Sequence, residues 1–249
     1  MLFIGLDDTD ILESRGTGHL ARHIAAVLDA ELAGSMGLVR GVTRHQLLVD
    51  PRVPCTKNNS CAALLLEAAG PVCPGGQSGE HGPGDGDLDP IVVLERVRAL
   101  MLEDFQPGSD PGLCVARGVP VAITEFGRRA QQQLVTQAEA RALAAAHQIP
   151  MLGLGGTEDG VIGALAAVGL AAGGEDGRYV LVDRSRELTG LQPVSALLEA
   201  GIAAVQTVDG LPVVEGLIQT DKLRPARRGG QPIAVVEWAG DYWLPLKLD

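Results

Sequence analysis

Apolar positions divide the first third of the chain into short strands and amphipathic helices. Residues 2–6 form an apolar run that ends at an acidic cluster, which predicts a buried strand. Apolar side chains then recur at helical spacing over residues 20–32 and predict an amphipathic helix. A strand is expected over residues 41–50, followed by a helix over residues 61–69 that Asn58, Asn59 and Ser60 can cap.

The remaining pattern predicts a mixed α/β (α+β) protein of two units. Residues 70–90 are rich in Gly and Pro and hold too few apolar side chains to order themselves, so a flexible loop is expected. Next come a helix over residues 91–101 and strand-like runs within residues 113–125. A second unit begins near residue 131, where Thr136 and Glu139 form a capping box. We therefore expect domains at residues 1–130 and 131–249, the second with an apolar helix over residues 161–170, a short helix over residues 194–200, and strands over residues 179–182, 205–208, 213–218, 233–238 and 242–246.

Composition limits the classes of function. With 46% hydrophobic and 20% charged residues, the chain is globular rather than disordered. The net charge of -11 opposes unaided binding of nucleic-acid phosphates, and the basic run over residues 222–228 is interpreted as a solvated loop rather than an RNA contact. Four cysteines without a Cys-x-x-Cys pair indicate neither a disulfide framework nor a zinc site. No signal peptide or membrane span is recognised, so a cytoplasmic protein without a membrane partner is expected.

The acidic cluster is the first candidate for chemistry. Asp7, Asp8 and Asp10 follow the first strand, and carboxylates gathered at a strand end can hold Mg²⁺ while nucleotide phosphates and water complete its ligands. Asp8 and Asp10 share a side if the strand continues. The alternatives are a solvated turn and an Asp-x-Asp phosphotransferase of the haloacid dehalogenase type, although Leu12 stands where Thr or Val is usual.

A Gly-rich turn follows the acidic cluster and leads into the first helix. Its backbone amides and the helix N-terminus offer donors to an anion. Thr17 is placed to donate to a phosphate oxygen or to accept a phosphoryl group, although a simple helix cap is an alternative and the Walker A ending is missing. His19 and His23 are spaced for a shared metal, but no third ligand is evident. The expected nucleotide-binding residues here are Thr9, Arg15, Gly16 and Gly18.

Two further segments carry polar groups toward the same strand end. Arg44, His45, Asn58, Asn59 and Ser60 are candidate substrate-binding residues, with a salt-bridged Arg and a satisfied core His as the alternative. A second Gly-rich turn, with Gly155, Gly156 and Gly160, precedes the apolar helix and is a further candidate for nucleotide binding. Its Glu158 and Asp159 favour a metal-bound phosphate or a cationic amine over a bare anion.

Together, several motifs resemble a known family. They are Ile-Gly-Leu-Asp-Asp-Thr-Asp at residues 4–10, the Arg15-Gly16 turn with Thr17, Leu-Val-Asp-Pro-Arg-Val-Pro at residues 48–54, and the Gly- and Ala-rich run over residues 160–169. Over about residues 1–170 the chain resembles the TiaS-like family of archaeal isoleucine-tRNA agmatinylcytidine synthetases. The resemblance implies a kinase-like catalytic domain followed by a ferredoxin-like domain.

The same resemblance implies an enzyme that uses ATP and Mg²⁺ to activate a tRNA cytidine oxygen as a phosphate ester, which agmatine displaces. Asp7, Asp8 and Asp10 would handle Mg²⁺ and ATP, and Thr17 would lie near the γ-phosphate.

This sequence departs from the family pattern in three respects. No Cys follows Cys114, so the family's zinc ribbon and OB-type tRNA-binding domain are not recognised. Residues 182–188 do not match the family's Tyr-rich segment, and aromatic residues make up only 3% of the chain. We therefore expect ATP-dependent transfer to a small-molecule acceptor. The alternatives are a tRNA-modifying ligase acting with a separate RNA-binding partner and a non-catalytic nucleotide sensor, and the oligomeric state is left open.

Overall fold

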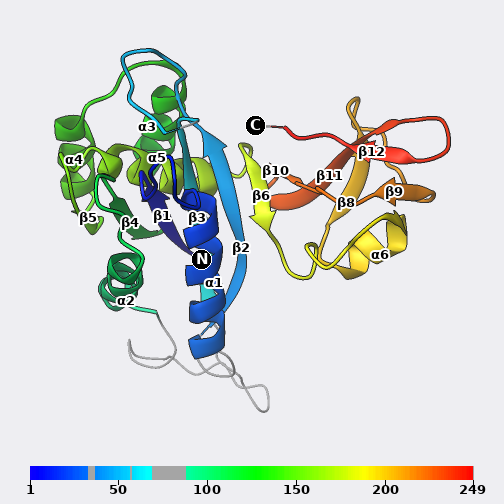
Figure 1. The fold of residues 1–249 in the computed structure, drawn as a ribbon, viewed down its shortest axis with the longest axis horizontal. Helices are drawn as coiled ribbons and strands as arrows, with labels where there is room; N and C mark the ends of the chain where they lie inside the picture. The colour runs from blue at the N-terminus through cyan, green and yellow to red at the C-terminus, as the bar shows by residue number, and fades with distance from the viewer. Residues whose placement is uncertain (33–36, 57, 69–87, 249) are drawn as a thin grey trace.

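The computed structural model describes residues 1–32, 37–56, 58–68 and 88–248, and the expected loop at residues 70–90 lies outside it except for its last three residues. The described residues form six helices and a twelve-stranded sheet (Figure 1). The helices are α1 (Thr17–Leu32), α2 (Pro90–Glu103), α3 (Val121–Gln132), α4 (Gln137–Ala146), α5 (Gly160–Gly173) and α6 (Val194–Glu199). The strands are β1 (Leu2–Asp7), β2 (Gly37–Gln46), β3 (Ser60–Ala68), β4 (Gly112–Arg117), β5 (Met151–Gly153), β6 (Arg178–Leu181), β7 (Leu191–Pro193), β8 (Ala204–Thr207), β9 (Leu217–Gln219), β10 (Ala226–Arg228), β11 (Gln231–Trp238) and β12 (Trp243–Pro245). The expected mixed α/β class is confirmed.

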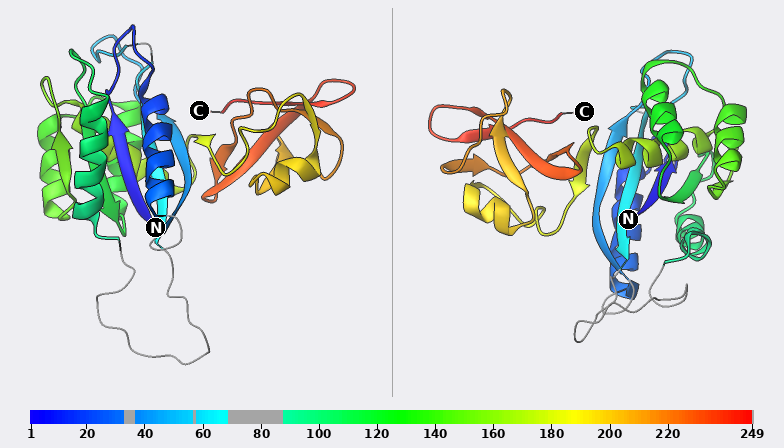
Figure 2. Two further views of the ribbon diagram at one scale, coloured as in Figure 1. Left: turned by 60° about the horizontal axis from the view of Figure 1, so that its bottom comes forward. Right: turned by 180° about the vertical axis from the view of Figure 1, so that it is seen from behind.

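Three layers build the larger part of the molecule, with strands in the order β5-β4-β1-β3-β2 at the centre. Strand alternation sends Leu2, Ile4 and Leu6 of β1 into the core that α1 and α2 cover. On the opposite face, α3, α4 and α5 cover the second core (Figure 2). β1 is antiparallel to both β3 and β4, so the end of β1 lies beside the start of each neighbour.

The sheet continues from β2 into the C-terminal part through β6, and then through β10, β11, β12, β9 and β7, with β8 paired to β11. This part lies to one side of the three layers in Figure 1. Helix α5 packs against β1, β3, β4 and α3, and β5 pairs with β4. Residues on both sides of the expected boundary at residue 130 thus contribute to the same three layers. No helix of the described residues is long and apolar enough to cross a membrane.

The predicted helix at residues 61–69 is wrong, because this segment forms β3. Its apolar run is buried on both faces of the sheet, Ala62 and Leu64 on one side and Ala63 and Leu65 on the other. A central strand covered on both faces loses the polar alternation that identifies a strand, and its apolar run is indistinguishable from that of a buried helix. The prediction of strand-like runs at residues 113–125 is confirmed up to Arg117, where β4 ends, and is wrong from Val121 onward, where α3 begins. The Thr136 half of the expected capping box is confirmed, because its side chain accepts a hydrogen bond from the Glu139 amide, whereas the Glu139 carboxylate pairs with Arg129.

Glycines on the sheet allow the backbone of α5 to contact the backbones of β1 and β4 directly. A Cβ added at Gly5 of β1 would lie 2.0 Å from the carbonyl oxygen of Ala164, and one at Gly112 of β4 would lie 2.1 Å from that of Gly160. This close packing holds the N-terminal end of α5 beside the end of β1, where the acidic cluster begins.

Candidate functional site

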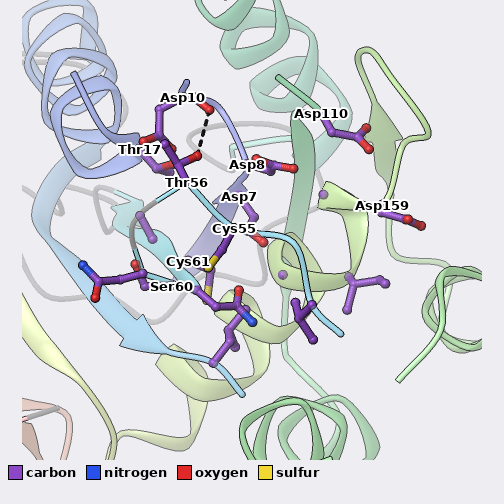
Figure 3. Close-up of a pocket in the computed structure, with 18 of the residues that line it drawn as sticks. Asp7, Asp8, Asp10, Thr17, Cys55, Thr56, Ser60, Cys61, Asp110 and Asp159 are labelled. Carbon is purple, nitrogen blue, oxygen red and sulfur yellow. Dashed lines mark hydrogen bonds between the residues drawn. The ribbon is translucent and has the colours of Figure 1, made fainter. Parts of the chain in front are cut away.

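A cavity of ≈ 660 Å³ lies where β1 ends. Its walls come from the start of α1, the connection between β2 and β3, the end of α3 and the start of α5 (Figure 3). The volume falls within the range that small-ligand sites occupy, roughly 300–1,000 Å³. Asp7, Asp8 and Asp10 at the end of β1 line this cavity together with Thr17, so the structure brings together the four residues expected to be catalytic.

Asp7 closes the side of the cavity formed by α5. As the last residue of β1 it points to the α5 face, opposite Leu6, and its carboxylate occupies the space that a side chain at Gly163 would fill. Burial, followed by the charges of Asp8 and Asp10, raises the pKa of Asp7 well above its usual value. The absence of a side chain at Gly163 therefore makes room for this carboxylate between the strand and the helix.

Asp8, the residue after β1, has a left-handed backbone. Its φ of 49° is unusual for a residue with a side chain and interrupts the alternation that would have placed Asp8 and Asp10 on one side. Burial and the charges of Asp110, Asp10 and Asp159 raise the pKa of Asp8 to about 6. Carboxylates that are partly buried and repel one another at the wall of a cavity are a suitable environment for a cation.

Asp110 is held next to Asp8 by the Gly-rich turn before α5. Its amide donates to the Asp8 carbonyl oxygen at 3.1 Å, and its carboxylate accepts from the amides of Thr157 and Glu158. The turn amides that we expected to bind phosphate therefore already bind Asp110. Gly155 lies against Phe105, and neither Gly155 nor Gly156 lines the cavity, whereas Gly160 does.

A chain of hydroxyl groups connects the acidic cluster to the first helix. Thr9 donates to the hydroxyl of Thr17 at 3.1 Å, and Thr17 donates to the Asp10 carboxylate at 3.2 Å. Both threonines are buried, and Thr9 lies behind Thr17 rather than at the cavity wall. Thr17 is the first residue of α1, so its hydroxyl and the Asp10 carboxylate both lie at the positive end of that helix.

The other expected ligand-binding residues differ in position. Arg15, Gly16, Gly18, Arg44, Asn58, Asn59 and Ser60 line the cavity. His45 does not, because it is fully buried, with Nδ1 2.7 Å from Asp176 and Nε2 2.9 Å from the Thr43 hydroxyl. Burial lowers the pKa of His45, and the contact with Asp176 opposes that shift. The alternative interpretation of a satisfied core histidine therefore describes His45, and no substrate contact is assigned to it.

Metal ligands are not preassembled here. Within the described ranges, no three His, Cys, Asp or Glu side chains are arranged to hold a metal ion between them. Mg²⁺ commonly uses one or two carboxylates together with water and substrate phosphates, which the Asp8 wall of the cavity can accommodate. His19 lies 3.1 Å from Arg15 through its Nε2 atom, and His23 is exposed on the helix.

Comparisons with known proteins give a match in structure alone. The sequence matches no family model and no curated protein. Two solved structures align with it at 23% identity over 68% of this chain: a tRNA fluorescent labeling enzyme, with a TM-score of 0.52, and a complex of TiaS with tRNA and ATP, with a TM-score of 0.51. The chain shares its fold with TiaS. The aligned part covers 35% and 36% of those two chains, so this chain spans about a third of their length.

The structure of apo TiaS, a tRNA agmatidine synthetase, is also similar to this chain, with a TM-score of 0.51. The family resemblance recognised in the sequence is thus confirmed at the level of the fold. The aligned share of 68% is similar in extent to the sequence resemblance.

Several cavity residues were not identified from the sequence. They come from segments whose meeting depends on strand register: Asp110 precedes β4, and β4 pairs with β1 so that Gly112 faces Asp7. Asp159, which the sequence related to a metal-bound phosphate or a cationic amine, reaches the same place from the start of α5. The acidic side chains themselves were a visible signal, but only the sheet order shows that they meet. The other cavity residues missed include Arg22, Arg52, Cys55, Thr56, Cys61 and Gln133.

The raised pKa of Asp8 predicts that the stability of the ligand-free protein depends on pH. The folded state holds the Asp8 proton up to about pH 6, whereas the unfolded chain releases it near pH 4. The free energy of unfolding should therefore fall as pH rises between these values. We expect Asp8→Asn to raise the melting temperature of metal-free protein more at pH 7 than at pH 4.5. An equal effect at both pH values in thermal melts would contradict this assignment.

Proposed function

We propose that this chain is an ATP- and Mg²⁺-dependent enzyme that transfers a phosphoryl group to an oxygen atom of a small acceptor molecule. The observation that carries the proposal is the set of carboxylates around Asp8, which faces a nucleotide-sized cavity beside Thr17 and the N-terminus of α1. Phosphoryl transfer is catalysed mainly by positioning the reacting groups and by stabilising charge. This arrangement provides both.

Each wall has a separate role in this proposal. Asp8, with Asp7 or Asp10, would hold Mg²⁺, whose charge offsets that of the phosphates during transfer. The backbone amides at Gly16 and Gly18 and the side chain of Arg15 would contact phosphate oxygens at the start of α1. The connection between β2 and β3, with Asn58 and Ser60, would contact the acceptor.

Thr17 would act at the terminal phosphate, where its hydroxyl donates to a phosphate oxygen or accepts the phosphoryl group. The hydrogen bond from Thr9 positions that hydroxyl, and its single proton, which is donated to Asp10 in the ligand-free protein, would turn to the phosphate oxygen. We expect Thr17→Val to reduce ATP turnover by at least about 100-fold, since a precisely placed polar group at the reacting centre is lost. Thr17→Ser keeps the hydroxyl and should retain turnover within about tenfold of wild type. Equal turnover in Thr17→Val and wild type would exclude a role for the hydroxyl.

Product analysis tests the proposed function. The full chain is incubated with Mg-ATP and a panel of small hydroxyl and carboxylate acceptors, and the nucleotides are separated by chromatography. Transfer of one phosphoryl group breaks the bond between the γ-phosphorus and its bridging oxygen and yields ADP. Release of AMP would overturn simple phosphoryl transfer. If Mg-ATP raises the melting temperature but no nucleotide is consumed with any acceptor, the non-catalytic sensor is favoured.

A tRNA-modifying ligase is the second candidate, because the fold is shared with TiaS in its complex with tRNA and ATP and in its complex with tRNA, AMPCPP and agmatine. In this case a separate RNA-binding partner would hold the tRNA. ATP consumption that depends on added bulk tRNA, together with retention of tRNA by this chain on a filter, would favour this candidate over a small acceptor.

A further inference from the structure

Four arginines from separate segments lie beside β6. Arg22 is on α1, Arg178 is on β6, Arg186 follows β6, and Arg224 precedes β10. α1 contacts β6, and β10 pairs with β6 so that Ala226 lies opposite Arg178. We call Arg22, Arg178, Arg186 and Arg224 the arginine cluster. It lies at β6, where the sheet of the three-layered part continues into the C-terminal part.

Three members of the arginine cluster, Arg22, Arg186 and Arg224, bond to backbone carbonyl oxygens, whereas several other arginines pair with carboxylates. Arg22, Arg186 and Arg224 donate to the carbonyl oxygens of Gly18, Val180 and Leu223, at 2.7, 3.1 and 2.7 Å. In the part of the chain that the structure describes, none of these three arginines forms an ion pair with a carboxylate. A guanidinium carries five N–H donors, so one bond to a carbonyl leaves donors for a ligand.

The positive charges also act on one another. Burial, followed by the charge of Arg186, lowers the pKa of Arg22. Burial, followed by the charges of Arg186, Arg22 and Arg178, lowers the pKa of Arg224. Because a guanidinium keeps its proton in proteins, an anion bound beside these side chains would offset their repulsion. Such a concentration of positive charge is notable in a chain whose net charge is -11.

The position of the cluster relates it to the cavity. Arg22 lines the cavity together with Arg44 and Val180, and Arg186 donates to the carbonyl oxygen of Val180. The cavity therefore has an acidic wall at Asp8, Asp110 and Asp159 and a basic wall at Arg22. A substrate with an anionic group at one end would be oriented by this difference in charge.

We propose that the arginine cluster binds the phosphate group of a phosphorylated small-molecule acceptor, with Arg22 connecting this site to the cavity. This inference rests on the proposed function, since it identifies the class of acceptor. Several guanidinium groups suit a phosphate dianion, which accepts through several oxygens. The net charge of -11 and the aromatic content of 3% favour a small ligand over an RNA strand, which would need a wider basic surface and stacking platforms.

Titration of the full chain with inorganic phosphate by calorimetry tests the inference. A saturating nonhydrolysable Mg-ATP analogue is present, so that phosphate does not enter the nucleotide site. The double variant Arg186→Gln/Arg224→Gln should bind phosphate at least about tenfold more weakly, because charge-assisted hydrogen bonds are lost. Arg186→Lys/Arg224→Lys keeps the charges and should bind more tightly than the Gln variant. Arg184→Gln removes an exposed arginine that pairs with Glu187 nearby, and should bind as wild type does.

Three results would overturn the inference: no phosphate binding by the wild type, equal binding by the wild type and the folded Gln variant, or an equal loss in Arg184→Gln. A mixed-sequence RNA oligonucleotide is titrated in parallel. Binding of RNA without binding of phosphate would also overturn it, because the site would then recognise a phosphodiester strand. Binding of the Mg-ATP analogue is measured separately on each protein, so failure of the proposed nucleotide site is distinguishable from failure of the phosphate site.

Discussion

Replacing Asp8 with asparagine should reduce ATP consumption by at least about 100-fold while the protein stays folded. The substitution removes the charge that would hold Mg²⁺ and keeps the size of the side chain. Because Asp8 lies among Asp110, Asp10 and Asp159, the loss of its charge relieves repulsion in the ligand-free protein. Activity should therefore fall while thermal stability at pH 7 rises, a combination that general damage to the fold would not produce.

The matched control for Asp8→Asn is Asp209→Asn. Asp209 is exposed in the C-terminal part and is not among the residues that line the cavity, so the same loss of one negative charge should leave ATP consumption unchanged. Rates are measured as ADP formation at saturating Mg-ATP, and folding is checked by thermal melts. Wild-type turnover by Asp8→Asn would remove the acidic cluster from the mechanism.

Replacing Gly5 with alanine should destabilise the fold by about 3 kcal/mol, at the upper end of the usual cost of overpacking. The added Cβ would lie 2.0 Å from the Ala164 carbonyl oxygen and 3.1 Å from Val168. The nearest atom belongs to the backbone of α5, so no side-chain rotation relieves the clash. Either β1 or α5 must shift, and the acidic cluster at the end of β1 would move with it.

Gly18→Ala provides the control for added volume. At Gly18 the nearest atom to a new Cβ is the Arg22 guanidinium nitrogen at 3.8 Å, an ordinary contact. This helical position should gain up to about 1 kcal/mol from the better helix propensity of alanine. Urea unfolding midpoints of both variants are compared with that of wild type. Equal midpoints for Gly5→Ala and wild type would show that the backbone of α5 is not in direct contact with β1 at Gly5.

Elements with local signals could be predicted from the sequence. The apolar run of β1 precedes charged residues, α1 shows helical spacing, and Thr136 caps α4 through its own side chain. β3 could not be identified in this way, because its burial on both faces depends on neighbouring strands that the sequence does not place. A surface helix can be recognised from its own spacing of polar and apolar residues. A fully apolar segment has no such spacing, so its sequence does not distinguish a strand from a helix.

The candidate site was predicted where its residues are close in sequence. Asp7, Asp8, Asp10 and Thr17 lie in one short segment and meet at one cavity. Asp110 joins them only because β4 pairs with β1, and the turn before α5 is occupied by Asp110 rather than open to phosphate. The structure places His45 outside the cavity, where its ring nitrogens contact Asp176 and Thr43, and strand position alone does not show these contacts.

Calorimetric titration of ATP into the full chain, with Mg²⁺ in one series and EDTA in the other, measures whether the acidic cluster binds a nucleotide through Mg²⁺. We expect binding heat in the Mg²⁺ series, little heat with EDTA, and loss of the Mg²⁺-dependent heat in Asp8→Asn. The absence of Mg²⁺-dependent heat with every purine nucleoside triphosphate tested would contradict a nucleotide site at Asp8.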